Sequence, residues 1–234
     1  MAAGIYAFIR YPLPLLPHHP HISLMSTPPE PATSHTNPSP LKALHNRPPL
    51  LLGLLGAASG ALGAVMPEPI GEILRPLGDL LFLKGTIVHP ALLFAPIIAY
   101  GVWAFGGLES GRRMMATAIA FVAAVAGWSV AVAIAVNLHS LKIAAAWLPS
   151  DALIPGFAAG AAGAALVFLG GAMAVPALRP VRVWAPGVLI GAIAGLLLLP
   201  AGLSSNYGLL GPLSLLMIWQ ASVATWFGRG LIAR

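Results

Sequence analysis

Cysteine is absent from this 234-residue chain, and charged residues are scarce. The absence of cysteine excludes disulfides, thiolate metal sites and cysteine nucleophiles. Charged residues make up 8% of the chain and hydrophobic residues 58%, and the mean hydropathy is +0.88. So little charge cannot cover a water-facing surface. The composition therefore excludes an ordinary soluble domain and predicts a protein whose main partner is the lipid bilayer.

Carboxylates number only six, and each lies in the N-terminal tail or in a predicted loop. Proton- and cation-coupled transporters use carboxylates buried in their spans, because a charge at the bilayer centre is costly and is kept only for function. The sequence also lacks HExxH, GxSxG and GxxxxGK[ST] motifs. We therefore predict no catalytic residue, no enzyme activity, no metal site and no ion coupling through a buried carboxylate.

The first 48 residues are rich in Pro, His, Ser and Thr and show no sustained periodicity. Such a composition is typical of a disordered segment, and a shortage of acid also fits an organellar leader weakly. We predict a disordered Pro/His-rich leader over residues 1–48, or a start that has been assigned too early. Residues 49–234 then form one transmembrane domain.

Five windows of low polarity are long enough to span a membrane, which takes about 20 residues. The last window is long enough for two helices, and the turn-forming segment Pro200–Gly208 divides it. The sequence therefore predicts an all-α, polytopic membrane protein with about six transmembrane helices. The windows are Pro48–Pro67, Gly85–Leu108, Met114–Leu141, Ala152–Leu178 and Val183–Gly228.

Basic residues predict the orientation of these spans. Lys and Arg give the chain a net charge of +6, but they occur singly or in pairs between apolar runs, so they do not form a nucleic-acid patch. An N-in, C-in arrangement places four basic pairs inside and three single basic residues outside, as the positive-inside rule favours. We expect a multi-pass protein of the cell inner membrane. The inside pairs are Lys42 and Arg47, Arg112 and Arg113, Arg179 and Arg182, and Arg229 and Arg234.

Small residues recur every four positions within the spans, most regularly at Gly187, Gly191 and Gly195. This spacing lets helix backbones approach closely in a membrane. It predicts tight helix packing and favours self-association, or packing as a subunit of a larger membrane complex. Polar residues in the spans, such as Gln220, more often form hydrogen bonds between helices than functional sites.

Two histidines, His89 and His139, are the candidate cofactor ligands. His89 opens the second predicted span and His139 closes the third, so both are expected near the outer face. An imidazole pair there would ligate a haem iron or another transition metal. Neither histidine lies in a diagnostic motif. Interfacial histidines without a ligating role are the alternative.

The run GLLGAASGALGAVMPEPIGEILRPLGDL, followed by Lys84, an apolar span and GLESGRR, resembles the first spans of the dicarboxylate/amino acid:cation symporter (glutamate transporter) family. In that family a Phe-Pro-Glu type corner ends the first span, and here Met66, Pro67 and Glu68 correspond to it. The resemblance covers roughly residues 50–138. It implies the static scaffold that mediates trimer contacts. The family's substrate-binding half and its Asn-Met-Asp-Gly-Thr motif have no counterpart here, so no ligand residue is carried over.

The leading hypothesis from the sequence is a membrane protein resembling the scaffold part of a secondary transporter, with a transport-related or assembly role. It would be a scaffold-only relative, a truncated gene product or a remodelled descendant of that family. The alternatives are a haem- or metal-binding redox protein that uses His89 and His139, and a non-catalytic subunit of a membrane complex.

Overall fold

The computed structural model describes residues 40–66, 89–140, 153–198 and 210–233 of the protein. The chain divides into the units Met1–Asn37 and Pro38–Arg234, and every described residue belongs to the second. The described residues form helices, and no strand occurs in these ranges. The prediction of an all-α fold is confirmed for this part of the chain.

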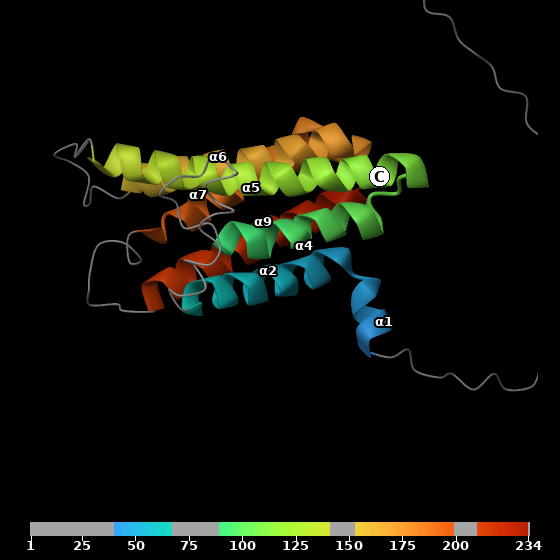
Figure 1. Ribbon diagram of the computed structural model, residues 1–234, viewed down its shortest axis with the longest axis horizontal. Helices are drawn as coiled ribbons and strands as arrows, with labels where there is room; N and C mark the ends of the chain where they lie inside the picture. Colours follow the sequence, from blue (N-terminus) through green and yellow to red (C-terminus); the bar gives the residue numbers. More distant parts are fainter. Residues whose placement is uncertain (1–39, 67–88, 141–152, 199–209, 234) are drawn as a thin grey trace, which may run out of the picture. The chain divides into compact units, whose positions relative to one another are not determined.

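The described ranges contain six apolar helices. They pack side by side, as Figure 1 shows. Four of them, α2, α5, α6 and α9, are long and apolar enough to cross a membrane, whereas α4 and α7 are shorter. At 1.5 Å per residue the 15 residues of α7 extend for about 22 Å and the 31 residues of α5 for about 46 Å. The helices are α2 (Pro48–Val65), α4 (His89–Phe105), α5 (Ser110–Ser140), α6 (Leu153–Ala174), α7 (Val181–Gly195) and α9 (Leu210–Ile232).

Each helix lies within one of the predicted windows or overlaps it closely. Helix α5 begins at Ser110, four residues before its window, so the basic pair Arg112 and Arg113 belongs to its first turn. The short helix α1 (Pro40–His45) lies inside the segment for which we predict disorder. The predicted turn Pro200–Gly208 and the acidic segment that follows Met66 lie outside the described residues.

Helix ends follow local chemistry. Helix α2 starts with prolines in its first two positions, where their missing N–H groups cost nothing. It ends at Val65, and the next residue, Met66, is extended because the following Pro67 disfavours a helical conformation. Gly107 adopts a φ of 63° in the turn between α4 and α5, a conformation that glycine tolerates best. This turn makes α4 and α5 antiparallel neighbours.

Glycines set the closest helix contacts. A Cβ added at Gly56 of α2 would lie 2.6 Å from the carbonyl oxygen of Gln220 in α9, and one added at Gly156 of α6 would lie 2.5 Å from that of Gly195 in α7. Only a residue without a side chain permits these approaches, which increase dispersion contact between helices. The four-residue glycine spacing therefore serves packing inside this chain. The surface that the sequence suggested for self-association is already covered.

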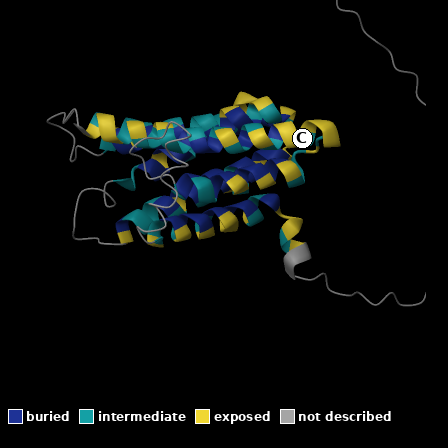
Figure 2. Cartoon of the chain, viewed as in Figure 1, coloured by how far each residue is buried: buried dark blue, intermediate teal, exposed yellow. Residues whose placement is uncertain are grey.

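The core contains aliphatic and aromatic side chains from all six apolar helices, with Phe168 of α6 packed on Phe227 of α9 at a centroid distance of 5.7 Å. Buried residues face the neighbouring helices and exposed residues face outward (Figure 2). Many of the outward residues are large and apolar, including Leu62, Met114 and Leu189. Apolar outer faces of this kind suit contact with lipid, which supports a membrane protein.

Candidate functional site

His89 is the first residue of α4, and its imidazole Nε2 donates to the carbonyl oxygen of Gly63 at 3.0 Å. Gly63 lies in the last turn of α2, where helix carbonyls have no partner within the helix. The histidine therefore satisfies an otherwise unpaired carbonyl and fastens the start of α4 to the end of α2. This is a structural role that the sequence alone does not show.

His139 lies in the last turn of α5, and its side chain is exposed. Helix α4 has 17 residues and α5 has 31. Since the two helices are antiparallel and joined by a short turn, the difference of 14 residues carries the end of α5 about 20 Å past the start of α4. Figure 1 shows α5 extending beyond α4 at that end. The structure therefore places His89 and His139 at different levels and does not bring their imidazoles together. Among the described residues no group of three or more His, Cys, Asp or Glu side chains occurs.

A buried polar junction joins three helices. Ser59 of α2 donates its hydroxyl to Gln220 Oε1 of α9 at 2.7 Å, and Gln220 Nε2 donates to the carbonyl oxygen of Pro90 in α4 at 3.5 Å. Ser59 and Gln220 are the buried polar residues of the described core. Gln220 confirms the prediction of hydrogen bonds between helices. Ser59 could not be recognised as the partner of Gln220 from the sequence, because the two residues are 161 positions apart.

Other hydroxyls in the spans behave differently. Thr117, Ser129 and Thr225 donate to the carbonyl oxygen four residues earlier in their own helices, at 2.7–2.8 Å. The expectation of hydrogen bonds between helices is wrong for these three. A hydroxyl in an apolar helix finds the i−4 carbonyl without help from another element, so these residues need no partner across the interface. Tyr207 and Asn206 lie outside the described ranges.

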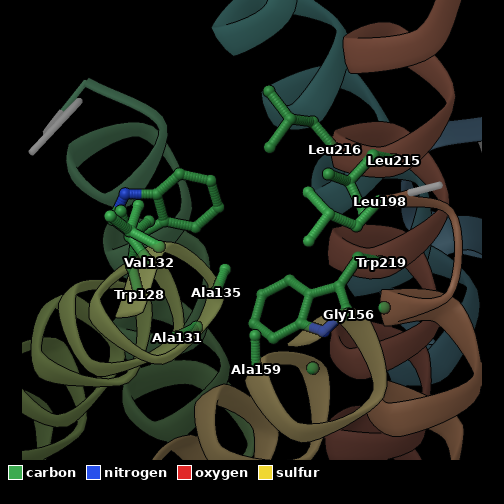
Figure 3. A pocket seen from close by; sticks show the side chains of 13 residues that line it. Trp128, Ala131, Val132, Ala135, Gly156, Ala159, Leu198, Leu215, Leu216 and Trp219 are labelled. Atoms are coloured by element: carbon green, nitrogen blue, oxygen red, sulfur yellow. The ribbon is translucent and has the colours of Figure 1, made fainter. Parts of the chain in front are cut away.

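An apolar pocket of about 220 Å³ opens between α5, α6, α7 and α9. Figure 3 shows the indole rings of Trp128 and Trp219 on opposite sides of it. Small residues of α6 form the floor, because Gly156, Ala159 and Gly160 leave room that larger side chains would fill. No lining residue carries a charge. The lining residues are Trp128, Ala131, Val132, Ala135, Val136, Gly156, Ala159, Gly160, Gly195, Leu198, Leu215, Leu216 and Trp219.

Trp219, one of the lining residues, carries a buried polar group without a partner. Its side chain is 5% exposed, and its indole Nε1 has no hydrogen-bond partner among the described residues. Burying an N–H donor without an acceptor costs about 1–3 kcal/mol in proteins, and native structures rarely leave one so. The side chain of Trp219 therefore contributes apolar surface to the pocket wall, while its unpaired N–H is buried within the protein. Sequence reasoning missed it, since Trp219 there is one of six dispersed tryptophans.

Charges gather at one end of the bundle. Gly228 of α9 lies against Pro49 of α2, Gly106 approaches Val175, and Gly230 lies against Leu178 and Val183, so these helix ends meet at the same end. The arginines of the described ranges all lie there, accompanied by one carboxylate, Glu109. They are Arg47, Arg112, Arg113, Arg179, Arg182 and Arg229.

The described helices thus have an uncharged interior, an apolar pocket lined in part by Trp219, and a strongly basic end. In comparisons with protein-family models, curated proteins and solved structures, nothing matches this chain.

Proposed function

We propose that all six apolar helices cross the bilayer, with both termini and the basic end on the cytoplasmic side of the cell inner membrane. The clustering of six arginines at one end supports this orientation, since positively charged segments are retained inside. The shorter helices α4 and α7 lie among the four long ones, and each contacts neighbours on both sides. A short apolar helix that is packed between long ones lies at the same depth in the bilayer as its neighbours.

Topology is directly testable because the chain has no native cysteine. A cysteine at Gly111, which has open space around it at the basic end, and one at the exposed His139 at the other end give two reporters. We expect a membrane-impermeant maleimide to label intact cells at position 139 and to label position 111 only after permeabilisation. The reverse pattern would overturn the orientation, and labelling of both sites in intact cells would remove the membrane placement.

For the role of the protein, we propose a transport-related function in which an uncharged, apolar ligand occupies the pocket between α5, α6, α7 and α9. The pocket itself is the observation that carries this proposal. Its walls hold no charged side chain, so they offer no counter-charge to a dicarboxylate. The pocket walls can bind a ligand by burying its apolar surface, which contributes about 25 cal/mol of binding free energy per Å² buried. The resemblance to a transporter scaffold is consistent with such a role.

A photoreactive alkyl diazirine tests the pocket in detergent-purified protein. We expect labelling at Trp128 and Leu215 that is lost in Ala135→Phe, which fills the pocket, and retained in Ala133→Phe, which places the same ring on the exposed side of α5. Equal labelling in both variants would contradict the ligand site. In proteoliposomes, uptake of labelled glutamate or succinate would contradict the preference for an uncharged ligand.

A second candidate, a subunit of a larger assembly or a homo-oligomer, is favoured by the outer face of α5. Only 22% of the span window of this helix is buried, and Met114, Met115, Val122 and Val136 are exposed. This apolar face can be covered equally well by a helix of a partner protein or by lipid. Cysteine at Val122 should give crosslinked dimers in native membranes if two copies meet there. Absence of any crosslink or co-purifying protein under mild detergent would remove the assembly role.

A further inference from the structure

A groove between α6 and α7 lies at the basic end of the bundle, away from the pocket described above. Its volume is about 550 Å³. Phe168, Leu169, Met173 and Trp184 form apolar walls, and Arg179 lies at one end. Leu169 and Met173 are 57% and 64% exposed, respectively, so the groove faces the surroundings of the bundle. In a membrane those surroundings are lipid chains.

Arg179 is held in place over this groove. Its Nε donates to the carbonyl oxygen of Ala172, in the last turn of α6, at 3.2 Å. That bond satisfies a carbonyl at a helix end and fixes the guanidinium where α6 gives way to α7. The terminal nitrogens of a guanidinium fixed through Nε retain further N–H donors in the planar arrangement that matches a phosphate.

Further positive charge lies on the adjoining helix ends. Arg182 is exposed in the first turn of α7. Arg229 of α9 stacks on Trp226 at 5.0 Å, and Trp226 Nε1 donates to the carbonyl oxygen of Val183 at 2.6 Å. These contacts tie the end of α9 to the start of α7. Within the described ranges the one carboxylate, Glu109, lies before α5 and not on these helices.

We propose that this groove is a binding site for an anionic phospholipid, with the phosphate at Arg179 and an acyl chain along Leu169 and Met173. Charge complementarity commits the site to this occupant, because basic pockets between transmembrane helices on the cytoplasmic side suit anionic headgroups. A water-soluble phosphate would leave the apolar walls uncovered. The inference rests on the membrane placement proposed above but is independent of the apolar pocket.

Native mass spectrometry of the full chain with phosphatidylglycerol or phosphatidylcholine of identical acyl chains tests the site. We expect preferential retention of phosphatidylglycerol, and a loss of about fivefold in that preference in Arg179→Gln, since one arginine near the membrane surface contributes about 1 kcal/mol. Arg112→Gln removes the same charge at the same end but away from the groove, and should leave the preference unchanged. If both variants lose the preference for phosphatidylglycerol equally, the preference comes from the overall positive surface potential and the proposed site is disproved.

The acyl part of the site has its own test. Ala165 lines the groove, and Ala165→Phe should reduce retention of phosphatidylglycerol although every arginine remains. Unchanged retention would overturn the groove. Arg179→Lys keeps the charge and should retain most of the preference for phosphatidylglycerol. If Arg179→Gln elutes as an aggregate, the comparison of Arg179→Lys with the wild type and with Ala165→Phe replaces it. A chain that extracts from membranes with alkaline carbonate disproves the membrane placement, whereas an embedded chain that retains both lipids equally disproves only the lipid site.

Discussion

Replacing Gly56 by alanine tests how the bundle is held together. The added Cβ would lie 2.6 Å from Gln220 O and 2.9 Å from Gln220 C, both backbone atoms of α9. Backbone cannot move aside as a side chain does, so α2 and α9 must separate. The separation also strains the Ser59–Gln220 hydrogen bond, which lies one helical turn away on the same interface. Overpacking of this kind costs about 1–3 kcal/mol.

Gly111→Ala is the matched control, because nothing lies within 4 Å of a Cβ added there. Alanine is the better helix former by up to about 1 kcal/mol, so this variant should be as stable as the wild type or slightly more stable. Unfolding in mixed micelles of increasing denaturing detergent, followed by helical circular dichroism, measures both. If Gly56→Ala unfolds at the same detergent fraction as Gly111→Ala, the close contact of α2 with α9 is refuted.

Three further predictions concern polar groups. Ser59→Ala and Gln220→Leu should each cost about 1–3 kcal/mol by leaving a buried partner unpaired, and the double variant should cost less than their sum in a double-mutant cycle. Replacing Trp219 by 3-benzothienylalanine, in which a sulfur atom stands in place of the indole N–H and the ring size is kept, should leave the detergent midpoint unchanged or raise it, whereas a clear drop would show that the N–H has a partner. His89→Phe should lower stability by about 0.5–1.5 kcal/mol without altering the visible absorption spectrum. A Soret band in the purified protein that disappears in this variant would instead support the haem alternative.

Local pattern was sufficient to predict the helices. Hydropathy and the placement of Pro and Gly are properties of neighbouring residues, and the windows starting at Pro48 and Ala152 match α2 and α6 to within a few residues. The window for α5 started late because its first turn carries Arg112 and Arg113. Charge at a helix end is compatible with the helix but lowers the local hydropathy, so a hydropathy window excludes it.

The contacts between helices could not be predicted in this way. The glycines of α7 suggested a surface for a second copy, yet Gly191 and Gly195 lie against Gly160 and Gly156 of α6. Small residues spaced every four positions predict that a helix has a flat face, but they do not predict which helix packs against that face. The same limit applies to Ser59, whose chemistry is visible only beside Gln220.

The sequence by itself established that cysteine is absent, and it predicted apolar helices, confirmed for the described residues, that are long enough to enter a membrane and carry charge only near their ends. Those conclusions follow from composition and from the cost of placing charge in hydrocarbon. The tertiary structure alone decided that His89 holds a helix end and stands apart from His139, that Trp219 Nε1 lies without an acceptor among the described residues, and that Arg179 lines an apolar groove. Each depends on distances between side chains that are remote in sequence, and no local pattern encodes such distances.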